Sequence, residues 1–315
     1  MNMKKILLFA LLGAVFSAAM AYRPAIQTPS SGKIDRIYMY SPQMRDSVTV
    51  DVWLPEEYAG SPERRWPVLY MHDGQNLYDA ATTWNRQSWE IDSVVSSLAS
   101  RREIDVPIIV GVHSVADKRV GELMPQKAFK AHPELLDSMS AYFGGLEVCG
   151  DAYADFVVNT LRPEIDRRYR TLSDPDHTLV MGSSMGGLMS VYMLCEYPEV
   201  FGGAGCLSTH WIGRVEDAAK GDYRFAQAIY DYLEARLPRD RSHRLYFDRG
   251  TETIDAYYGY CDDRVIALVQ ALGFTRPDRL ETYVDQGAAH EENAWRKRVS
   301  RPLRFLLPVR ERPAD

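Results

Sequence analysis

Hydrophobic and polar positions alternate in the first part of the chain, and short runs that are largely apolar follow. The alternation covers residues 33–40 and 47–54 around the polar turn Pro42–Asp46, which predicts an antiparallel hairpin. Continuous apolar runs are typical of strands that a parallel sheet buries on both faces. Such runs lie at 66–72 and 106–112, and further strands are predicted at 178–181, 202–207, 244–247 and 280–284.

Helical segments separate these predicted strands. They are predicted at 89–98, 151–169, 188–197, 224–237, 263–272 and 294–307. Pro163 lies inside the second of them and predicts a kink or a break there. Because strands alternate with helices from residue 66 onward, the sequence predicts an α/β fold. Its mostly parallel, twisted sheet would carry the N-terminal hairpin and have helices on both faces.

One stretch, residues 114–150, shows no steady period. It mixes charges and two prolines with the aromatic residues Phe129, Tyr142 and Phe143. A long irregular insertion in a compact domain is often a lid or a binding wall. The alternative is a surface excursion that covers an edge of the sheet, and the sequence leaves both open.

The first 21 residues have the pattern of a cleaved signal peptide. Lys4 and Lys5 precede the apolar stretch Ile6–Phe16, and Ala19–Ala21 fits an A-x-A cleavage site. The apolar stretch is too short for a comfortable membrane span, although an uncleaved anchor is the alternative. We therefore expect a periplasmic or secreted protein that is not inserted in a membrane after cleavage.

The mature chain is predicted to form one domain, and its net negative charge predicts that it does not bind polyanions. Residues 22–32 are expected to be a flexible lead-in and residues 33–315 a single domain, since no linker, repeat or low-complexity run divides them. The formal charge of the 315-residue chain is −6, and loss of the two signal-peptide lysines makes it −8. This balance argues against nucleic acid or an anionic membrane as a partner. The four cysteines match no zinc pattern, so buried thiols are expected, with a disulfide as the alternative.

The segment Gly182–Gly187 reads Gly-Ser-Ser-Met-Gly-Gly and carries the first candidate chemistry. It contains the motif G-x-S-x-G between the predicted strand at 178–181 and the predicted helix at 188–197. This context indicates a nucleophile elbow, which holds Ser184 on a strained backbone with its hydroxyl exposed. A serine hydroxyl needs a general base, and the base needs an acid that fixes its tautomer.

The base is expected after Ser184 in the chain, where His210, His243 and His290 are the three histidines. His290 follows the last predicted strand, so it should lie at the carboxyl edge of the sheet, where open α/β folds bind ligands. His243 precedes a strand and should lie at the opposite edge. His210 fits a pocket wall better, and we predict His290 as the base.

The acid is expected after the predicted strand at 244–247, where four acidic residues occur. Asp248 is still at the strand end, and Asp262 lies deeper in a polar aromatic stretch. Glu252 and Asp255 remain, and the pattern of residues does not decide between them. The other of the two would serve as a helix cap, since acids are favourable near a helix N-terminus.

An oxyanion hole requires two backbone N–H groups. Met185, which follows the nucleophile, is expected to supply one. The loop after the third strand supplies the other, and Gln75 is its candidate because Gly74 permits close approach of the backbone. No metal site and no cofactor are expected. His72 and Asp73 lack a second ligand pair, and H-E-x-x-H fails after His290 because residue 294 is Ala.

Six segments together carry a resemblance to a known family. They are Met71–Asp79, Val110–Val112 with Arg119 and Glu122, Arg162–Arg170, the Ser184 elbow, Gly250–Asp255, and Gly287–His290 with Trp295. They resemble the putative-esterase branch of the α/β-hydrolases, which is similar to feruloyl and acetyl-xylan esterases, siderophore esterases and S-formylglutathione hydrolases. The resemblance covers about residues 35–310. It implies the α/β-hydrolase fold, and it favours Asp255 over Glu252 as the acid.

These observations predict an exported serine esterase that cleaves carboxylic esters through Ser184, His290, Asp255 and an acyl-enzyme. Export and the resemblance favour acetyl or feruloyl esters on plant polysaccharide. The alternatives are hydrolysis of a siderophore lactone or another small ester, acyl transfer to an alcohol, and a non-catalytic carbohydrate-binding protein. A protein that only binds would not need a serine, an acid, a histidine and an oxyanion loop together. The oligomeric state is left open. Candidate pocket walls are Trp84, Trp89, Trp211 and Tyr142.

Overall fold

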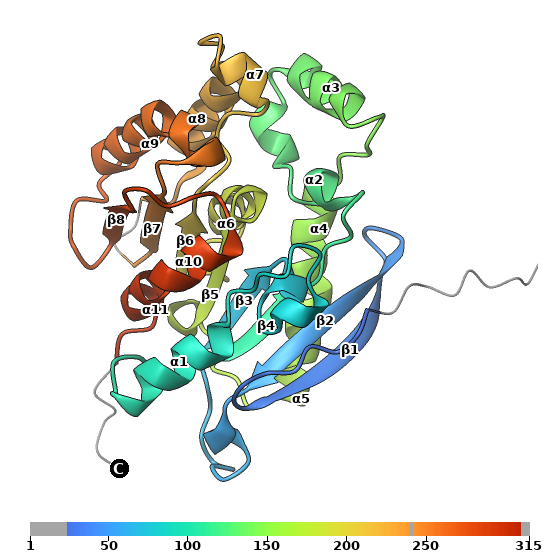
Figure 1. The fold of residues 1–315 in the computed structure, drawn as a ribbon, viewed down its shortest axis with the longest axis vertical. Coiled ribbons are helices and arrows are strands. Elements are labelled where there is room, and N and C mark those ends of the chain that lie inside the picture. The colour runs from blue at the N-terminus through green and yellow to red at the C-terminus, as the bar shows by residue number, and fades with distance from the viewer. Residues whose placement is uncertain (1–23, 240–241, 310–315) are drawn as a thin grey trace, which may run out of the picture.

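A twisted sheet of eight strands runs through the described part of the chain, residues 24–239 and 242–309 of this computed structural model (Figure 1). The strand order is β1-β2-β4-β3-β5-β6-β7-β8. The strands are β1 Lys33–Ser41, β2 Asp46–Leu54, β3 Val68–His72, β4 Ile108–Val112, β5 Thr178–Ser183, β6 Gly203–Leu207, β7 Arg244–Arg249 and β8 Leu280–Val284. The predicted signal peptide lies outside the described residues.

The sheet combines an antiparallel edge with a parallel body. β1 pairs with β2 antiparallel, from Lys33 opposite Leu54 to Ser41 opposite Asp46. β2 pairs antiparallel with β4, and all further pairs from β4 through to β8 are parallel. The predicted hairpin and the mostly parallel sheet are therefore confirmed. Because β3 and β5 to β8 run the same way, the loops that follow them meet at one edge.

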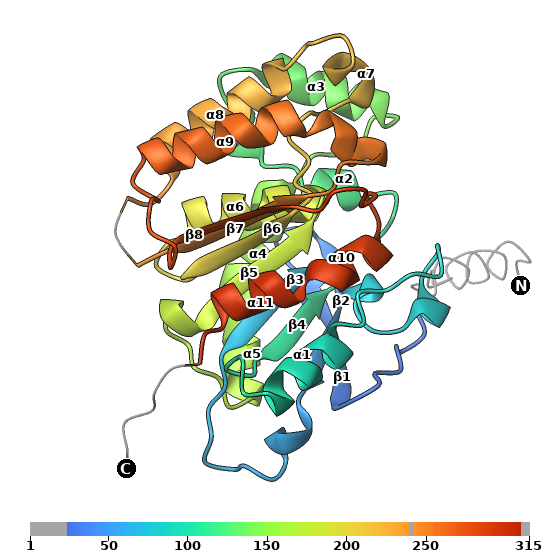
Figure 2. The same cartoon turned by 60° about the vertical axis from the view of Figure 1, so that its left-hand side comes forward.

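Helices cover both faces of the sheet, as predicted (Figure 2). One face carries α1 Ile91–Ser100, α10 Glu292–Arg298 and α11 Ser300–Leu306. The other carries α4 Gly150–Phe156, α5 Arg162–Arg168, α6 Met185–Glu196, α8 Arg224–Arg236 and α9 Gly259–Ala271. The irregularity predicted at Pro163 takes the form of a π-helical turn, Val157–Leu161, which separates α4 from α5.

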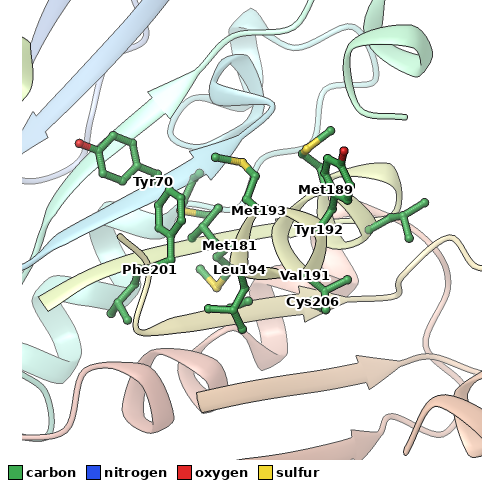
Figure 3. Packing of buried hydrophobic residues seen from close by; sticks show 14 of the residues in the cluster. Tyr70, Met181, Met189, Val191, Tyr192, Met193, Leu194, Phe201 and Cys206 are labelled. Carbon is green, nitrogen blue, oxygen red and sulfur yellow. The ribbon is translucent and has the colours of Figure 1, made fainter. Parts of the chain in front are cut away.

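The hydrophobic core continues beneath the predicted elbow. α6 is apolar on all sides, and every one of its residues except the last is buried (Figure 3). Met189 and Met193 of α6, Met181 of β5 and Cys206 of β6 belong to this core, and all four side chains are almost completely buried. A helix of this kind can exist only inside a large core. The turn between β5 and α6 therefore rests on a rigid base.

The insertion at residues 114–150 is more regular than the sequence indicates. It contains α2 Arg119–Glu122 and α3 Pro133–Tyr142, joined by a short 3-10 helix, Gln126–Phe129. Phe129 packs against Phe225 of α8 with 4.5 Å between ring centroids. α3 lies close to α7, Val215–Ala218, above the edge where the loops meet (Figures 1 and 2). In this position the insertion forms a wall beside the loops at the carboxyl ends of the strands, which agrees with the first of the two alternatives.

The predicted lead-in has no regular secondary structure in its described part, but hydrogen bonds anchor it. Gln27 is 2% exposed and donates from Nε2 to Asp51 and to the carbonyl of Gly74. Ser30 donates from both N–H and hydroxyl to Asp92 of α1. Residues 24–32 are thus part of the domain and contact β2, α1 and the turn at Gly74.

The four cysteines are free thiols. Cys195, Cys206 and Cys261 are buried, and Cys149 is half-buried. Burial raises the pKa of each thiol. Among the described helices, none combines the length and apolar character that a membrane span would need.

Candidate active site

Ser184 lies at the sharp turn between β5 and α6. Its backbone has φ 57° and ψ −123°, outside the regions that a side-chain-bearing residue usually adopts. The turn is crowded, because a Cβ on Gly182 would come within 2.8 Å of the Gly186 backbone. The Ser184 N–H donates to the carbonyl of Leu207, at the end of β6. The strained serine is therefore fixed between two strands, as a nucleophile elbow requires.

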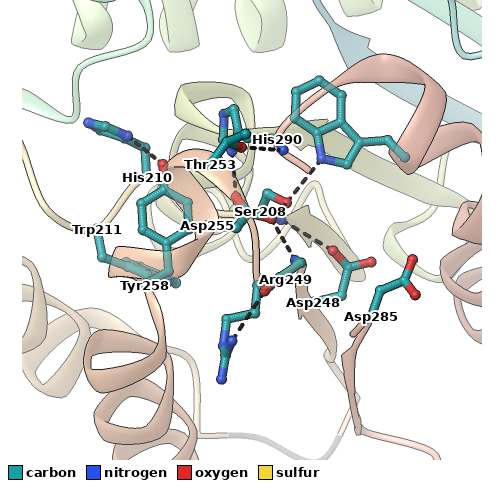
Figure 4. A network of polar contacts seen from close by, with 12 residues as sticks. Ser208, His210, Trp211, Asp248, Arg249, Thr253, Asp255, Tyr258, Asp285 and His290 are labelled. Carbon is teal, nitrogen blue, oxygen red and sulfur yellow. Dashed lines mark hydrogen bonds and ion pairs between the residues drawn. The ribbon is translucent and has the colours of Figure 1, made fainter. Parts of the chain in front are cut away.

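His290 and Asp255 meet beside this turn. Nδ1 of His290 lies 2.6 Å from Oδ1 of Asp255, and the Asp255 side chain is fully buried (Figure 4). Asp255 lies in the 3-10 helix Thr253–Tyr257 after β7, and His290 lies in the loop between β8 and α10. The structure thus brings together two residues that the sequence separates by 35 positions.

Backbone contacts join the two loops that carry this pair. The N–H of His290 donates to Thr253 Oγ1 at 2.9 Å, and the N–H of Gly287 donates to Thr251 Oγ1 at 2.8 Å. The carbonyl of Ala288 accepts from the N–H groups of Thr251 and Glu252. The distance between the acid and the imidazole is therefore set by main chain as well as by side chains.

The environment of Asp255 keeps its carboxylate ionised. Burial alone would raise the pKa of Asp255, but hydrogen bonds from His290, Ser208 and the Gly250 N–H outweigh it and lower that pKa. An ionised carboxylate only accepts, so Nδ1 of His290 must carry the proton. In the neutral imidazole this leaves the lone pair on Nε2, which is the arrangement of a general base.

The other candidate acids have different partners. Asp248 accepts from Arg298 and from the hydroxyl of Tyr246, and Asp262 accepts from the indole of Trp211 at 2.6 Å. Glu252 is exposed at the start of the 3-10 helix and caps no backbone N–H there. Of the four acids, Asp255 is the one that contacts His290.

The other two histidines that follow Ser184 serve elsewhere. His243 is buried and hydrogen-bonds the carbonyl of Pro198. His210 lies nearer the site, with Nδ1 2.7 Å from the Tyr258 hydroxyl and Nε2 2.6 Å from the Gly213 carbonyl. Burial lowers the pKa of His210 to about 4, so its ring is neutral and fits the wall that the sequence predicts.

The candidate oxyanion donors lie on adjacent turns. Gln75 is in the 3-10 turn Gly74–Asn76, and Met185 is the first residue of α6. First-turn N–H groups have no acceptor within their own helix, so both are available to a ligand. A Cβ on Gly186 would lie only 3.2 Å from the Cβ of His72, which places the loop against the elbow.

Arg119 is a residue near the site for which the sequence alone suggested no role. It donates to both oxygens of Asp73 at 2.7 Å, and Ser114 donates to the same carboxylate. Asp73 has φ 57° and begins the turn that carries Gln75. Asp73 is marked by its place after a strand, and both residues lie in segments that carry the family resemblance, but no pattern in the sequence pairs Arg119 with Asp73.

The predicted pocket walls divide into two groups. Trp84 is 87% exposed and Tyr142 is 51% exposed, whereas Trp89 and Trp211 are buried. Asn85, next to Trp84, donates to Glu292, two residues after His290. Trp84 and Tyr142 are therefore free to contact a ligand, and the other two tryptophans belong to the core.

His72 and Asp73 are engaged with Tyr153 and Arg119. Within residues 24–239 and 242–309, no three His, Cys, Asp or Glu side chains form a group that could hold a metal ion.

The elbow, the histidine–aspartate pair and the strand order define an α/β-hydrolase. The family described as "Putative esterase" matches residues 41–313, and the chain belongs to it. It is a carboxylic ester hydrolase. The family and the fold class are those that the resemblance implied.

The chain is similar to proteins whose names describe esterases. An endo-1,4-beta-xylanase/feruloyl esterase of Xylanibacter ruminicola is 23% identical over 293 residues, which is 91% of this chain and 32% of that protein. A ferulic acid esterase structure has a TM-score of 0.61 at 16% identity, covering 87% of this chain and 97% of that one. The enterobactin esterase of Shigella flexneri has a TM-score of 0.58 at 17% identity, covering 90% of this chain and 60% of that one. The chain thus spans about a third of the first protein and 60% of the last.

Proposed function

We propose that the chain is an exported serine esterase that cleaves acetyl or feruloyl esters on plant polysaccharide. The observation that carries this proposal is the 2.6 Å contact between His290 and Asp255 beside the strained Ser184. Export rests on the signal-peptide pattern of residues 1–21.

In this mechanism Ser184 attacks the ester carbonyl, and Nε2 of His290 takes its proton. Asp255 holds the imidazole in the required tautomer and stabilises the imidazolium. The N–H groups of Gln75 and Met185 stabilise the negative charge on the tetrahedral oxygen. His290 then protonates the leaving alkoxide, and water hydrolyses the acyl-enzyme by the same steps in reverse.

A polysaccharide ester is favoured by the likeness to ferulic acid esterase and to the bifunctional xylanase. The exposed rings of Trp84 and Tyr142 offer flat apolar surfaces to the C–H faces of sugar rings. The likeness to enterobactin esterase supports the second candidate, hydrolysis of a siderophore lactone. The apolar walls suit either substrate, so measurement must separate them.

The mechanism is tested with Ser184→Ala on a small aryl acetate. We expect a loss of kcat of about 10⁴-fold or more with an unchanged Tm. The matched control is Ser190→Ala. Ser190 is a buried serine on α6, the helix that follows Ser184, and its hydroxyl donates to the Gly186 carbonyl. Retained activity in Ser184→Ala would exclude the serine mechanism.

The substrate is tested by comparing kcat/KM on acetylated xylan, feruloylated arabinoxylan and a siderophore trilactone. A polysaccharide esterase should prefer the first two, and Trp84→Ala should lower kcat/KM on them by about tenfold while sparing an aryl acetate. Tyr40→Ala is the control, since Tyr40 is 62% exposed on β1, the edge strand remote from β5. A preference for the trilactone would replace the polysaccharide assignment.

A further inference from the structure

The carboxylate that faces His290 is held from its other side by a hydroxyl and a backbone N–H. Oδ2 of Asp255 accepts from Ser208 Oγ at 2.6 Å and from the Gly250 N–H at 2.5 Å (Figure 4). Ser208 directly follows β6, is fully buried and has φ 42°. A residue with a side chain keeps such a conformation only where its surroundings impose it. The fold therefore places this hydroxyl against Asp255 at a conformational cost.

The surroundings of Ser208 leave its hydroxyl proton only one acceptor. A serine hydroxyl has one proton to donate and two lone pairs. Trp295 Nε1 donates to Ser208 Oγ at 3.0 Å, and Arg298 Nη2 donates to it at 2.7 Å. Indole and guanidinium nitrogens only donate, so both lone pairs are occupied. The Ser208 proton must then go to Asp255.

The same two donors connect Ser208 to the base and to a buried ion pair. The Trp295 ring packs edge-on against His290, with 5.1 Å between centroids and 83° between planes. Arg298 also lies 3.1 Å from Oδ1 of Asp248, and both side chains are almost fully buried. The hydroxyl of Ser208 thus separates the Arg298 guanidinium from the Asp255 carboxylate.

We propose that Ser208 is a positioning residue for ester hydrolysis, whose hydroxyl orients the Asp255 carboxylate and keeps its charge directed at His290 instead of Arg298. This role rests on the proposed functions of Asp255 and His290. It assigns a purpose to the left-handed backbone at the end of β6, where a glycine would relieve the strain but remove the hydroxyl.

The test uses Ser208→Gly, which suits the backbone and removes the hydroxyl together with its CH2 group, with Ser190→Ala as the control for loss of a buried serine hydroxyl. On an aryl acetate we expect kcat to fall about 10- to 100-fold at constant KM, the factor that a buried charge-assisted hydrogen bond supplies. The acid limb of the kcat/KM profile should move to higher pH. A carboxylate that has lost a donor attracts the imidazole proton more strongly. Ser190→Ala should match the parent in both measurements.

Trp295→Phe provides an independent variant if Ser208→Gly does not fold. It keeps a ring against His290 and frees one lone pair of Ser208, so the proton is less firmly directed. We expect a loss of kcat of about two- to tenfold and a pH shift of the same sign. If Ser208→Gly folds, a parental kcat with an unchanged pH profile of kcat/KM would overturn the proposal. A loss of activity that matches the loss of folded protein measured by circular dichroism would also overturn it. If Ser208→Gly does not fold, an unchanged Trp295→Phe would overturn it.

The two proposals fail in different ways. An active Ser184→Ala would remove the serine mechanism and, with it, any role for Ser208. An inactive Ser184→Ala beside a fully active Ser208→Gly would leave the esterase mechanism in place and overturn only the positioning role.

Discussion

Asp51 and Asp255 are both fully buried carboxylates that contact a histidine, but among the described residues an arginine bonds directly only to Asp51. His113 Nε2 lies 2.9 Å from Asp51, and His290 Nδ1 lies 2.6 Å from Asp255. Arg36 donates to both oxygens of Asp51, at 2.6 and 2.7 Å. A bidentate pair commits the charge of the carboxylate to the arginine. Asp51 is therefore suited to hold structure together, and Asp255 keeps its charge for an imidazole.

The difference lies in one hydroxyl. Arg298 reaches Asp255 only through Ser208, whereas nothing separates Arg36 from Asp51. Burial alone would raise the pKa of both aspartates, and in both the hydrogen bonds outweigh it and lower that pKa. Similar residues thus form a structural ion pair at Asp51, called the Asp51 clamp below, and the proposed acid–base pair at Asp255.

The Asp51 cluster lies under the loop of the candidate oxyanion hole. Gln27 joins Asp51 to the Gly74 carbonyl, and its own carbonyl accepts from the N–H of Tyr78. His113 closes the other side, since a Cβ on Gly74 would come within 2.9 Å of its ring. One aspartate orients the base, and the other steadies the loop that carries Gln75.

The largest expected difference is between the two histidines. His290→Gln should lower kcat on an aryl acetate by about 10⁵-fold, because it removes the proposed acceptor of the Ser184 proton. His113→Gln should change kcat by less than about tenfold, since it removes one contact beneath the oxyanion loop. Steady-state kinetics with matched Tm measurements compare them. Equal losses in the two variants would mean that the clusters do not differ as described.

The two aspartates should separate activity from stability. Asp255→Asn should lower kcat by about 10⁴-fold with the fold intact, because the amide favours the wrong imidazole tautomer. Asp51→Asn should cost about 3–5 kcal/mol of unfolding free energy, because Arg36, with its side chain 2% exposed, loses its counter-charge. Urea unfolding and kcat per folded molecule are the measurements. A stable Asp51→Asn with activity lost would reverse the two assignments.

Local sequence pattern was enough to predict the sheet and to select Ser184 and His290 as candidates, because strand periodicity and the elbow motif involve residues close in sequence. Glu252 and Asp255 could not be separated in this way, since both follow β7 within three positions of each other. The 3-10 helix Thr253–Tyr257 buries Asp255 completely and leaves Glu252 exposed. That choice depends on a tertiary turn and not on composition.

Polar contacts between residues far apart in the chain could not be predicted from the sequence either. Ser208 and Arg298 are 90 positions apart, and Gln27 and Gly74 are 47 apart. No period relates such pairs. The anchoring of residues 24–32 and the hydroxyl between Arg298 and Asp255 are visible only once the strands are in order.

Acid titration should expose the Asp51 clamp. Its folded pKa lies below the ordinary 3.8, so as the pH falls toward and below 4 the unfolded chain binds the proton first. The stability from this group is present above about pH 4 and is lost as the pH approaches the folded pKa. Urea midpoints from pH 6 to pH 3 should therefore fall more steeply for the parent than for Asp51→Asn. Parallel curves would mean that Asp51 is not the titrating group.

The smallest expected effect concerns the acid that the sequence could not exclude. Glu252 is exposed, and within the described residues no hydrogen bond or ion pair joins its side chain to His290, so Glu252→Gln should keep kcat within about twofold of the parent. Its backbone N–H still bonds the Ala288 carbonyl, so the loop that carries His290 is unchanged. A single kcat measurement beside Asp255→Asn decides the matter. If Glu252→Gln were crippled and Asp255→Asn active, the buried carboxylate would be a clamp like Asp51, and the proposed acid–base pair would have to be rebuilt around Glu252.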